Sequence, residues 1–139
     1  MIMSKNNITI LYLDLATSEV IQTDGYTMFL RKDNIIQLQI HEHFFVELKD
    51  AMLILEDITK LSNGHKYPLL VIYADDTSFS NETRVYISKH TLTKADALVS
   101  KSLALRIIGN FYIKMNKPIR PTKLFNDADD AITWLQTFT

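Results

Sequence analysis

The sequence lacks cysteine altogether and has only three glycines and three prolines in 139 residues. Without cysteine there is no disulfide, no thiol nucleophile and no cysteine-based zinc or iron–sulfur site. So few glycines leave little scope for a loop that cradles phosphate, and no P-loop, dinucleotide-binding or G-x-S-x-G pattern occurs. We therefore expect a protein that binds rather than catalyses, without enzymatic activity and without a cofactor.

Nothing in the composition divides the chain. It is 47% hydrophobic and 22% charged, and no repeat, low-complexity tract or Pro/Gly-rich linker is apparent. The opening apolar run is interrupted by Asp14, which argues against a signal peptide and a membrane span. We expect one domain over residues 1–139, with 1–19 as an N-terminal extension, in the cytoplasm of a bacterial-type cell.

The net charge of −1 predicts no strong attraction to nucleic acid and no stable membrane insertion. The charges are unevenly spread, however. All six Lys and Arg residues that follow residue 96 precede the first acid of that region, Asp127. The segment 97–126 is therefore basic and free of acids.

Short-range patterns predict an α/β fold that opens with a β-hairpin. Two strands, Tyr26–Arg31 and Ile35–Ile40, flank a turn at Asp33-Asn34, where both residue types tolerate positive φ. An amphipathic helix then begins at Glu47 and ends at Asn63-Gly64. Its predicted apolar face consists of Leu48, Ala51, Met52, Leu55, Ile58 and Thr59.

The remaining elements alternate between helix and strand. They are a buried strand at 69–74, a helix from Ser80 to about His90, a buried strand at 96–102, a helix at 103–116, a short strand at 122–125 and a closing helix at 127–138. Right-handed crossovers then place helices over a mixed sheet of about five strands. The predicted order is a hairpin followed by α-β-α-β-α-β-α, with Trp134 and Leu135 of the last helix in the core.

The helix at 103–116 carries two different surfaces. Arg106, Asn110 and Lys114 form a solvated polar stripe, and Gly109 lies at its margin. A helical glycine costs about 1 kcal/mol relative to alanine, so it indicates close approach of another element, a partner chain or a ligand. The predicted core face consists of Leu103, Ala104, Ile107, Ile108, Phe111 and Met115.

Two prolines follow this helix, at positions 118 and 121. They are explained by a helix end and a strand start. A second interpretation is that basic side chains line an anion-binding or interaction site at the sheet edge. The residues of that candidate site are Arg106, Gly109, Asn110, Lys114, Lys117 and Arg120, with Lys123 beside them.

The same region carries a family resemblance. "GN" within a helix, followed by "NKP", "PTKLF" and "AITWLQ", resembles the C-terminal signature of an uncharacterised bacterial family described as STAS-like or STAS/CRAL-TRIO-like. That family is akin to the anti-sigma-factor antagonists, and the resemblance runs from about residue 20 to the end. It implies a SpoIIAA-like α/β fold, and it implies a regulatory role through protein partners.

STAS antagonists are switched by phosphorylation of Ser or Thr at the start of the helix after a central strand. The matching segment here is "YADDTSFSNETR", so the resemblance implies Thr77, Ser78 and Ser80 as phosphorylation candidates. The family's glycine is absent from this segment. The alternative interpretation is that Ser80 caps the helix and Thr77-Ser78 form a polar turn.

Two other groups of residues could carry chemistry. Asp75-Asp76 follow a buried strand, where they could bind a cation, act as acid and base, or form a solvated turn that Arg84 and Lys89 balance. The histidines of "HEHFF" lack the spacing of a zinc motif. Their third ligand, His65 or His90, is not placed by any spacing, so we predict no metal site.

Three functions remain open at this point. The first is a non-enzymatic regulatory or protein-interaction module that is controlled by phosphorylation and binds a regulatory protein. The alternative is a small-molecule or lipid-binding module of CRAL-TRIO-like type, which needs an apolar pocket between sheet and helices. The third is an enzyme that uses Asp75 or Asp76. A homodimer through a hairpin edge or apolar helix faces is a further open arrangement.

Overall fold

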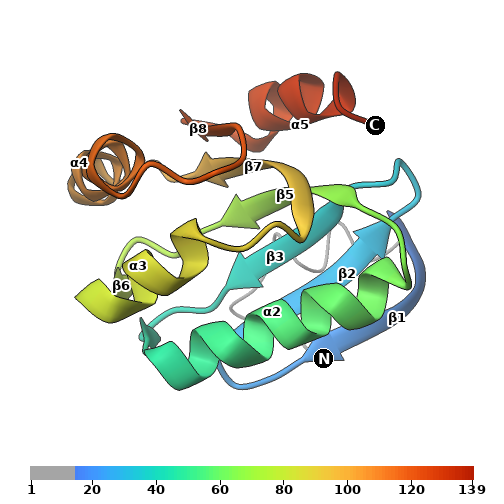
Figure 1. The fold of residues 1–139 in the computed structure, drawn as a ribbon, viewed down its shortest axis with the longest axis horizontal. Coiled ribbons are helices and arrows are strands. Elements are labelled where there is room, and N and C mark those ends of the chain that lie inside the picture. The colour runs from blue at the N-terminus through green and yellow to red at the C-terminus, as the bar shows by residue number, and fades with distance from the viewer. Residues whose placement is uncertain (1–14) are drawn as a thin grey trace.

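Six strands form one mixed sheet in the order β1-β2-β3-β5-β7-β8 (Figure 1). The computed structural model describes residues 15–139. The first three strands are antiparallel neighbours, whereas β3, β5, β7 and β8 run parallel. The strands are β1 (Ala16–Gln22), β2 (Tyr26–Arg31), β3 (Ile36–Ile40), β5 (Tyr67–Ile72), β7 (Thr93–Val99) and β8 (Thr122–Phe125).

Helices cover both faces of this sheet (Figure 1). The helices α2, α3 and α4 lie on one face, and α5 packs on the other face over β5 and β7. Their bounds are α2 (Leu48–Ser62), α3 (Asn81–Ser88), α4 (Leu103–Phe111) and α5 (Ala128–Gln136); α4 continues into a π-helical turn, η2 (Tyr112–Asn116). The predicted α/β order, a hairpin followed by alternating helices and strands, is confirmed.

The central strand β5 shows how the sheet separates two cores. Leu69 and Val71 point toward the core beneath α2, and Leu70 and Ile72 point toward α5. A strand covered on both faces needs apolar residues at every position, because successive side chains alternate between faces. The continuous apolar run in the sequence is therefore the signature of this central position.

The number of strands differs from the prediction. The sixth strand, β1, pairs with β2 and takes up the end of the expected extension 1–19, most of which lies outside the described residues. Its sequence, ATSEVIQ, carries too few apolar residues to mark a strand. A second small sheet joins β4 (Phe45–Val46) to β6 (Ser78–Phe79), in segments where no strand was predicted.

Two strands, β5 and β7, begin and end two or three residues earlier in the sequence than predicted. Pro68 lies inside β5, where a shift of register next to it removes the need for its missing N–H. The strand β7 begins at Thr93 and ends at Val99, rather than spanning 96–102. The residues after it form the entry to α4, since the Ser102 hydroxyl accepts a hydrogen bond from the Leu105 N–H.

The local signals in the first helix and hairpin were accurate, but the helix face was predicted only in part, with Ala51, Leu55 and Ile58 buried as expected. Asn34 and Asn63 adopt positive φ at the predicted turn and helix end. In α2, however, Met52 is 51% exposed, and Thr59 is exposed as well. The buried side chains are Ala51, Ile54, Leu55, Ile58 and Ser62, a stripe with regular helical spacing.

The face of α4 is a larger correction. The predicted core residues Leu103, Ile107, Phe111 and Met115 are 69, 61, 60 and 64% exposed. The helix instead turns Leu105 and Tyr112 inward. Because α4 lies at the margin of the sheet above β8, it has neighbours on one narrow side only.

None of the helices within residues 15–139 is long and apolar enough to cross a membrane.

Gly109 explains how closely α4 approaches the sheet. A Cβ atom added at this position would lie 2.8 Å from Cδ2 of Leu124 in β8, closer than carbon atoms can pack. The predicted close approach is therefore to another element of the fold. Asn110, the next residue, is exposed.

We expect Gly109→Val to lower the free energy of unfolding by about 1–3 kcal/mol, because the branched side chain forces α4 and Leu124 apart. The matched control is Asn110→Val, which places the same side chain on the exposed side and should change stability by less than about 0.5 kcal/mol. Urea denaturation measures both. Equal effects of the two substitutions would contradict the close approach.

Candidate functional site

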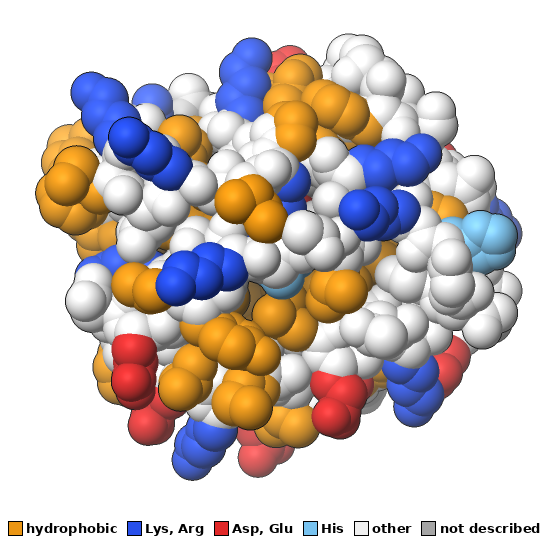
Figure 2. All heavy atoms as spheres, viewed as in Figure 1, with side chains coloured by type: hydrophobic (Ala, Val, Ile, Leu, Met, Phe, Trp, Pro, Cys, Tyr) orange, Lys and Arg blue, Asp and Glu red, His pale blue; other side chains and the backbone are white. Residues whose placement is uncertain are grey.

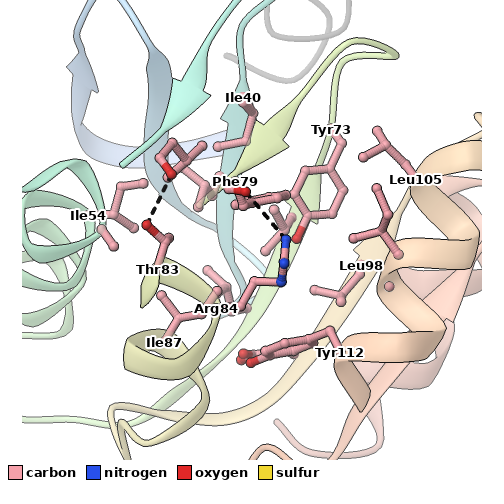
Figure 3. A pocket seen from close by; sticks show the side chains of 18 of the residues that line it. Ile40, Ile54, Tyr73, Phe79, Thr83, Arg84, Ile87, Leu98, Leu105 and Tyr112 are labelled. Atoms are coloured by element: carbon pink, nitrogen blue, oxygen red, sulfur yellow. Dashed lines mark hydrogen bonds between the residues drawn. The ribbon is translucent and has the colours of Figure 1, made fainter. Parts of the chain in front are cut away.

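A cavity of about 90 Å³ lies between the sheet and the helices α2, α3 and α4 (Figure 3). In the space-filling view, hydrophobic side chains surround a hollow near the middle of this face (Figure 2). The wall of the cavity is mainly aliphatic and includes Leu38, Val71 and Leu98 from the strands and Ile54, Ile87 and Leu105 from the helices. The predicted alternative function requires an apolar pocket in this place.

A buried ion pair forms the polar end of the cavity. Nε of Arg120 donates to Oδ2 of Asp96 at 2.7 Å, and the Thr93 hydroxyl donates to the other carboxylate oxygen at 2.6 Å. Arg120 also donates to the Ser88 and His90 carbonyls. Burial raises the pKa of Asp96, and the bonds from Arg120 and Thr93 oppose that rise. Arg120, predicted as a surface site residue, thus lies in the interior with its charge already compensated.

His90 lines the same end of the cavity. Its Nδ1 accepts a hydrogen bond from the Leu92 N–H at 3.1 Å, which requires that this nitrogen carry no proton. Burial, together with repulsion from Arg120, lowers the pKa of His90 to about 3. The imidazole is therefore neutral at physiological pH.

Arg84 is the second cation of the cavity, and it reaches in from α3 (Figure 3). Its Nη1 donates to the Phe79 carbonyl at 3.4 Å, a long hydrogen bond. No ion pair found among residues 15–139 includes Arg84. The sequence interpretation assigned it to the acids Asp75-Asp76, and no periodicity could have revealed the cavity that it lines.

The predicted phosphorylation segment separates into three environments. Thr77 is buried, and its hydroxyl has no hydrogen-bond partner among the described residues. Ser78 is exposed on β6. Ser80 is the N-cap of α3, because its hydroxyl accepts a hydrogen bond from the Thr83 N–H. The capping role is thus confirmed, while phosphorylation of any of the three stays a prediction.

The acidic turn contacts one of the two HEHFF histidines, His43. The Asp76 carboxylate accepts from the His43 N–H at 2.9 Å and pairs with its imidazole, and the backbone bond is the main reason that the pKa of Asp76 is lowered. His41 instead bonds to the Thr27 hydroxyl. Within the described part of the chain, no group of three or more His, Asp or Glu side chains is placed to hold a metal ion.

The exposed side of α4 and η2 forms a second surface, which we call the α4 ridge and define as Leu103, Ile107, Phe111 and Met115. Hydrophobic side chains gather over α4 at the left of Figure 2, with Lys and Arg side chains beside them. Three of the predicted basic site residues lie on or just after this helix, whereas Arg120 is buried. Lys114 and Lys117 are exposed, and Arg106 is partly exposed.

The neutral His90 predicts acid sensitivity. Because the folded-state pKa lies below the unfolded value of 6.5, the unfolded chain binds the proton first, and stability is lost as pH falls from 6.5 toward 3. In His90→Asn the amide oxygen can replace Nδ1 as the acceptor, and no imidazole remains to be protonated. Between pH 7 and pH 5 we therefore expect the free energy of unfolding to fall by about 1–2 kcal/mol more in the natural protein than in this variant. Urea denaturation at the two pH values measures this; parallel losses would contradict a neutral His90.

Comparison with known proteins places the fold and leaves the activity open. A crystal structure of an uncharacterised Shewanella loihica protein, from the DUF3478 family with a SpoIIAA-like fold, matches with a TM-score of 0.50 at 12% identity, covering 84% of this chain and 90% of that chain. This match confirms the predicted SpoIIAA-like fold. An Arthrobacter sp. FB24 protein of unknown function is 24% identical over 83% of this chain and 95% of that chain, with a TM-score of 0.29.

A search of curated proteins found no match. The model of one family matches residues 28–139, which include every element from β3 to α5 and the last four residues of β2. The chain therefore belongs to the family described as a domain of unknown function, DUF7793.

Proposed function

We propose that this protein is a non-enzymatic interaction module that binds a regulatory protein through the α4 ridge. The observation that carries this proposal is the exposure of four large apolar side chains along α4 and its continuation η2. Contiguous apolar surface is costly in water, and its burial by a partner yields about 25 cal/mol per Å². The SpoIIAA-like fold, with the resemblance to anti-sigma-factor antagonists, supports a partner of the regulatory class.

The charge around the ridge supports an acidic partner. Segment 97–126 contains six basic residues and no acid, and Lys114 and Lys117 are exposed beside the ridge. Opposite charges across an interface raise the association rate, whereas like charges disfavour it. A symmetric homodimer through this face would bring the basic residues of two copies together, so an acidic partner is the better fit.

Phosphorylation is the proposed control, acting at Ser78 or Ser80. Thr77 is less suited because its hydroxyl is buried. A phosphate on Ser80 would replace the N-cap hydroxyl at the start of α3, where the helix dipole favours negative charge and the nearby Asp75-Asp76 pair opposes it. A cytoplasmic location accords with such a role and is part of the proposal.

The ridge is tested with Ile107→Glu combined with Phe111→Glu. We expect this variant to fold normally and to lose the protein that the natural chain captures from an extract of its native host, because two charges would be buried at the contact. The matched control is Met52→Glu with Leu53→Glu on α2, whose side chains are 51 and 52% exposed. The control should retain the partner; loss or retention of the partner by both variants would contradict the assignment.

The basic flank makes a separate prediction. Arg106→Glu combined with Lys114→Glu should slow association with the captured partner by about tenfold or more at low salt, because electrostatic steering is reversed. Surface plasmon resonance between about 50 and 500 mM salt measures the effect, which should shrink as salt screens the charges. A salt-independent association rate would rule out an acidic partner.

Binding of a small apolar molecule is a second function, favoured by one observation, the cavity between the sheet and α2, α3 and α4. The interior of a domain is normally filled to crystal-like density. A cavity with aliphatic walls and a few polar groups at one end is typical of ligand pockets. The two functions use different sides of α4 and are compatible.

A further inference from the structure

The charged side chains that line the cavity sum to one net positive charge, which belongs to Arg84. Asp96 and Arg120 form an ion pair with each other. His90 is neutral, since its Nδ1 accepts a hydrogen bond. Arg84 is the remaining charged residue of the lining, and it forms none of the ion pairs found among residues 15–139. The cavity therefore presents an aliphatic wall and a single uncompensated cation.

The hydrogen bonding of Arg84 also indicates that its guanidinium can bind an anion. A guanidinium carries five N–H donors in a planar fork. Among the described residues, Arg84 uses one of them, in the 3.4 Å bond to the Phe79 carbonyl. Its other donors remain available to a planar acceptor with two oxygens, and a carboxylate has this geometry.

The volume sets the size of the apolar part. A cavity of about 150 Å³ binds benzene, which has six carbon atoms, so the cavity of about 90 Å³ holds roughly four apolar carbon atoms. An apolar tail of about four or five carbon atoms fits this limit, whereas that of a long fatty acid does not. A single excess charge favours a monoanion over a phosphate dianion.

We propose that the cavity binds a small amphipathic monocarboxylate, with the carboxylate on the Arg84 guanidinium and the apolar tail against Leu98 and Leu105. This assignment rests on the second function above, binding of a small molecule, and it names the ligand class. Tyr73 and Tyr112 border the same space and add aromatic surface near the polar end (Figure 3).

Hexanoate is the probe, and hexan-1-ol and hexylamine carry the same tail with a neutral and a cationic head. We expect saturable shifts of the backbone amide signals of cavity-lining residues in two-dimensional NMR titrations, with hexanoate bound at least tenfold more tightly than hexan-1-ol. Hexylamine should bind most weakly. The Arg84→Met variant, which keeps most of the aliphatic stem, should lose the preference for hexanoate and retain the affinity for hexan-1-ol.

Lys89→Met is the matched control, because it removes one positive charge from the exposed end of the same helix and should leave both affinities unchanged. Arg84→Lys keeps the charge without the planar fork and should give an intermediate preference. If Arg84→Met does not fold, as judged from its amide spectrum, the carboxylate assignment is tested by Arg84→Lys and by the affinities of the three probes for the natural protein.

The outcomes separate the ligand class from the underlying function. Equal affinities for hexanoate and hexan-1-ol, or a preference that survives Arg84→Met, would overturn the carboxylate assignment while leaving small-molecule binding in place. If no probe saturates at the cavity up to 10 mM, a ceiling on the order of the weakest specific affinities, both are overturned. The α4 ridge is tested independently, since its side chains lie outside the cavity.

Discussion

The ion pair between Asp96 and Arg120 organises the side of the sheet on which the cavity lies. Asp96 belongs to β7, and Arg120 belongs to the segment that leads from η2 into β8. A lone charge left in such a buried place costs several kcal/mol, so each partner constrains the other to stay. Through its bonds to the Ser88 and His90 carbonyls, Arg120 also connects the end of α3 to this segment. The Arg120 guanidinium thus joins β7, the end of α3 and the segment that leads into β8. Because Arg120 is buried in these contacts, the basic segment 97–126 does not present all of its charge to the solvent.

The same arrangement gives α4 its two faces. Its short contact with the sheet, made through Leu105 and Gly109 and continued by Tyr112, closes one side of the cavity. Because this contact uses so narrow a stripe, the larger apolar face remains outside as the α4 ridge. The two proposed functions therefore use different sides of a single helix. A ligand that displaced α4 would also move the ridge, which is one physical route by which the two proposed functions could be coupled.

Much of the fold could be predicted because its signals are local. The hairpin turn at Asn34, the end of α2 at Asn63 and the Ser80 cap each depend on the conformation or hydrogen bonding of a few neighbouring residues. Errors arose where a side chain's environment depends on distant elements. Periodicity identified the apolar side of α4, but it could not tell whether another element covers that side. Arg84 was missed as a cavity residue because its neighbours there, on β7 and α4, are remote in the sequence.

The sequence by itself determined the class of the fold, the order of its helices and of the strands β2, β3, β5, β7 and β8, the absence of thiol chemistry and the basic character of segment 97–126. These properties follow from residue types and from spacings within one element. Only the tertiary structure decided which apolar face is buried, which charge is compensated and where space remains unfilled. Burial and ion pairing are relations between segments that the chain brings together from positions such as 84, 96 and 120, and no spacing along the sequence encodes the distance between them.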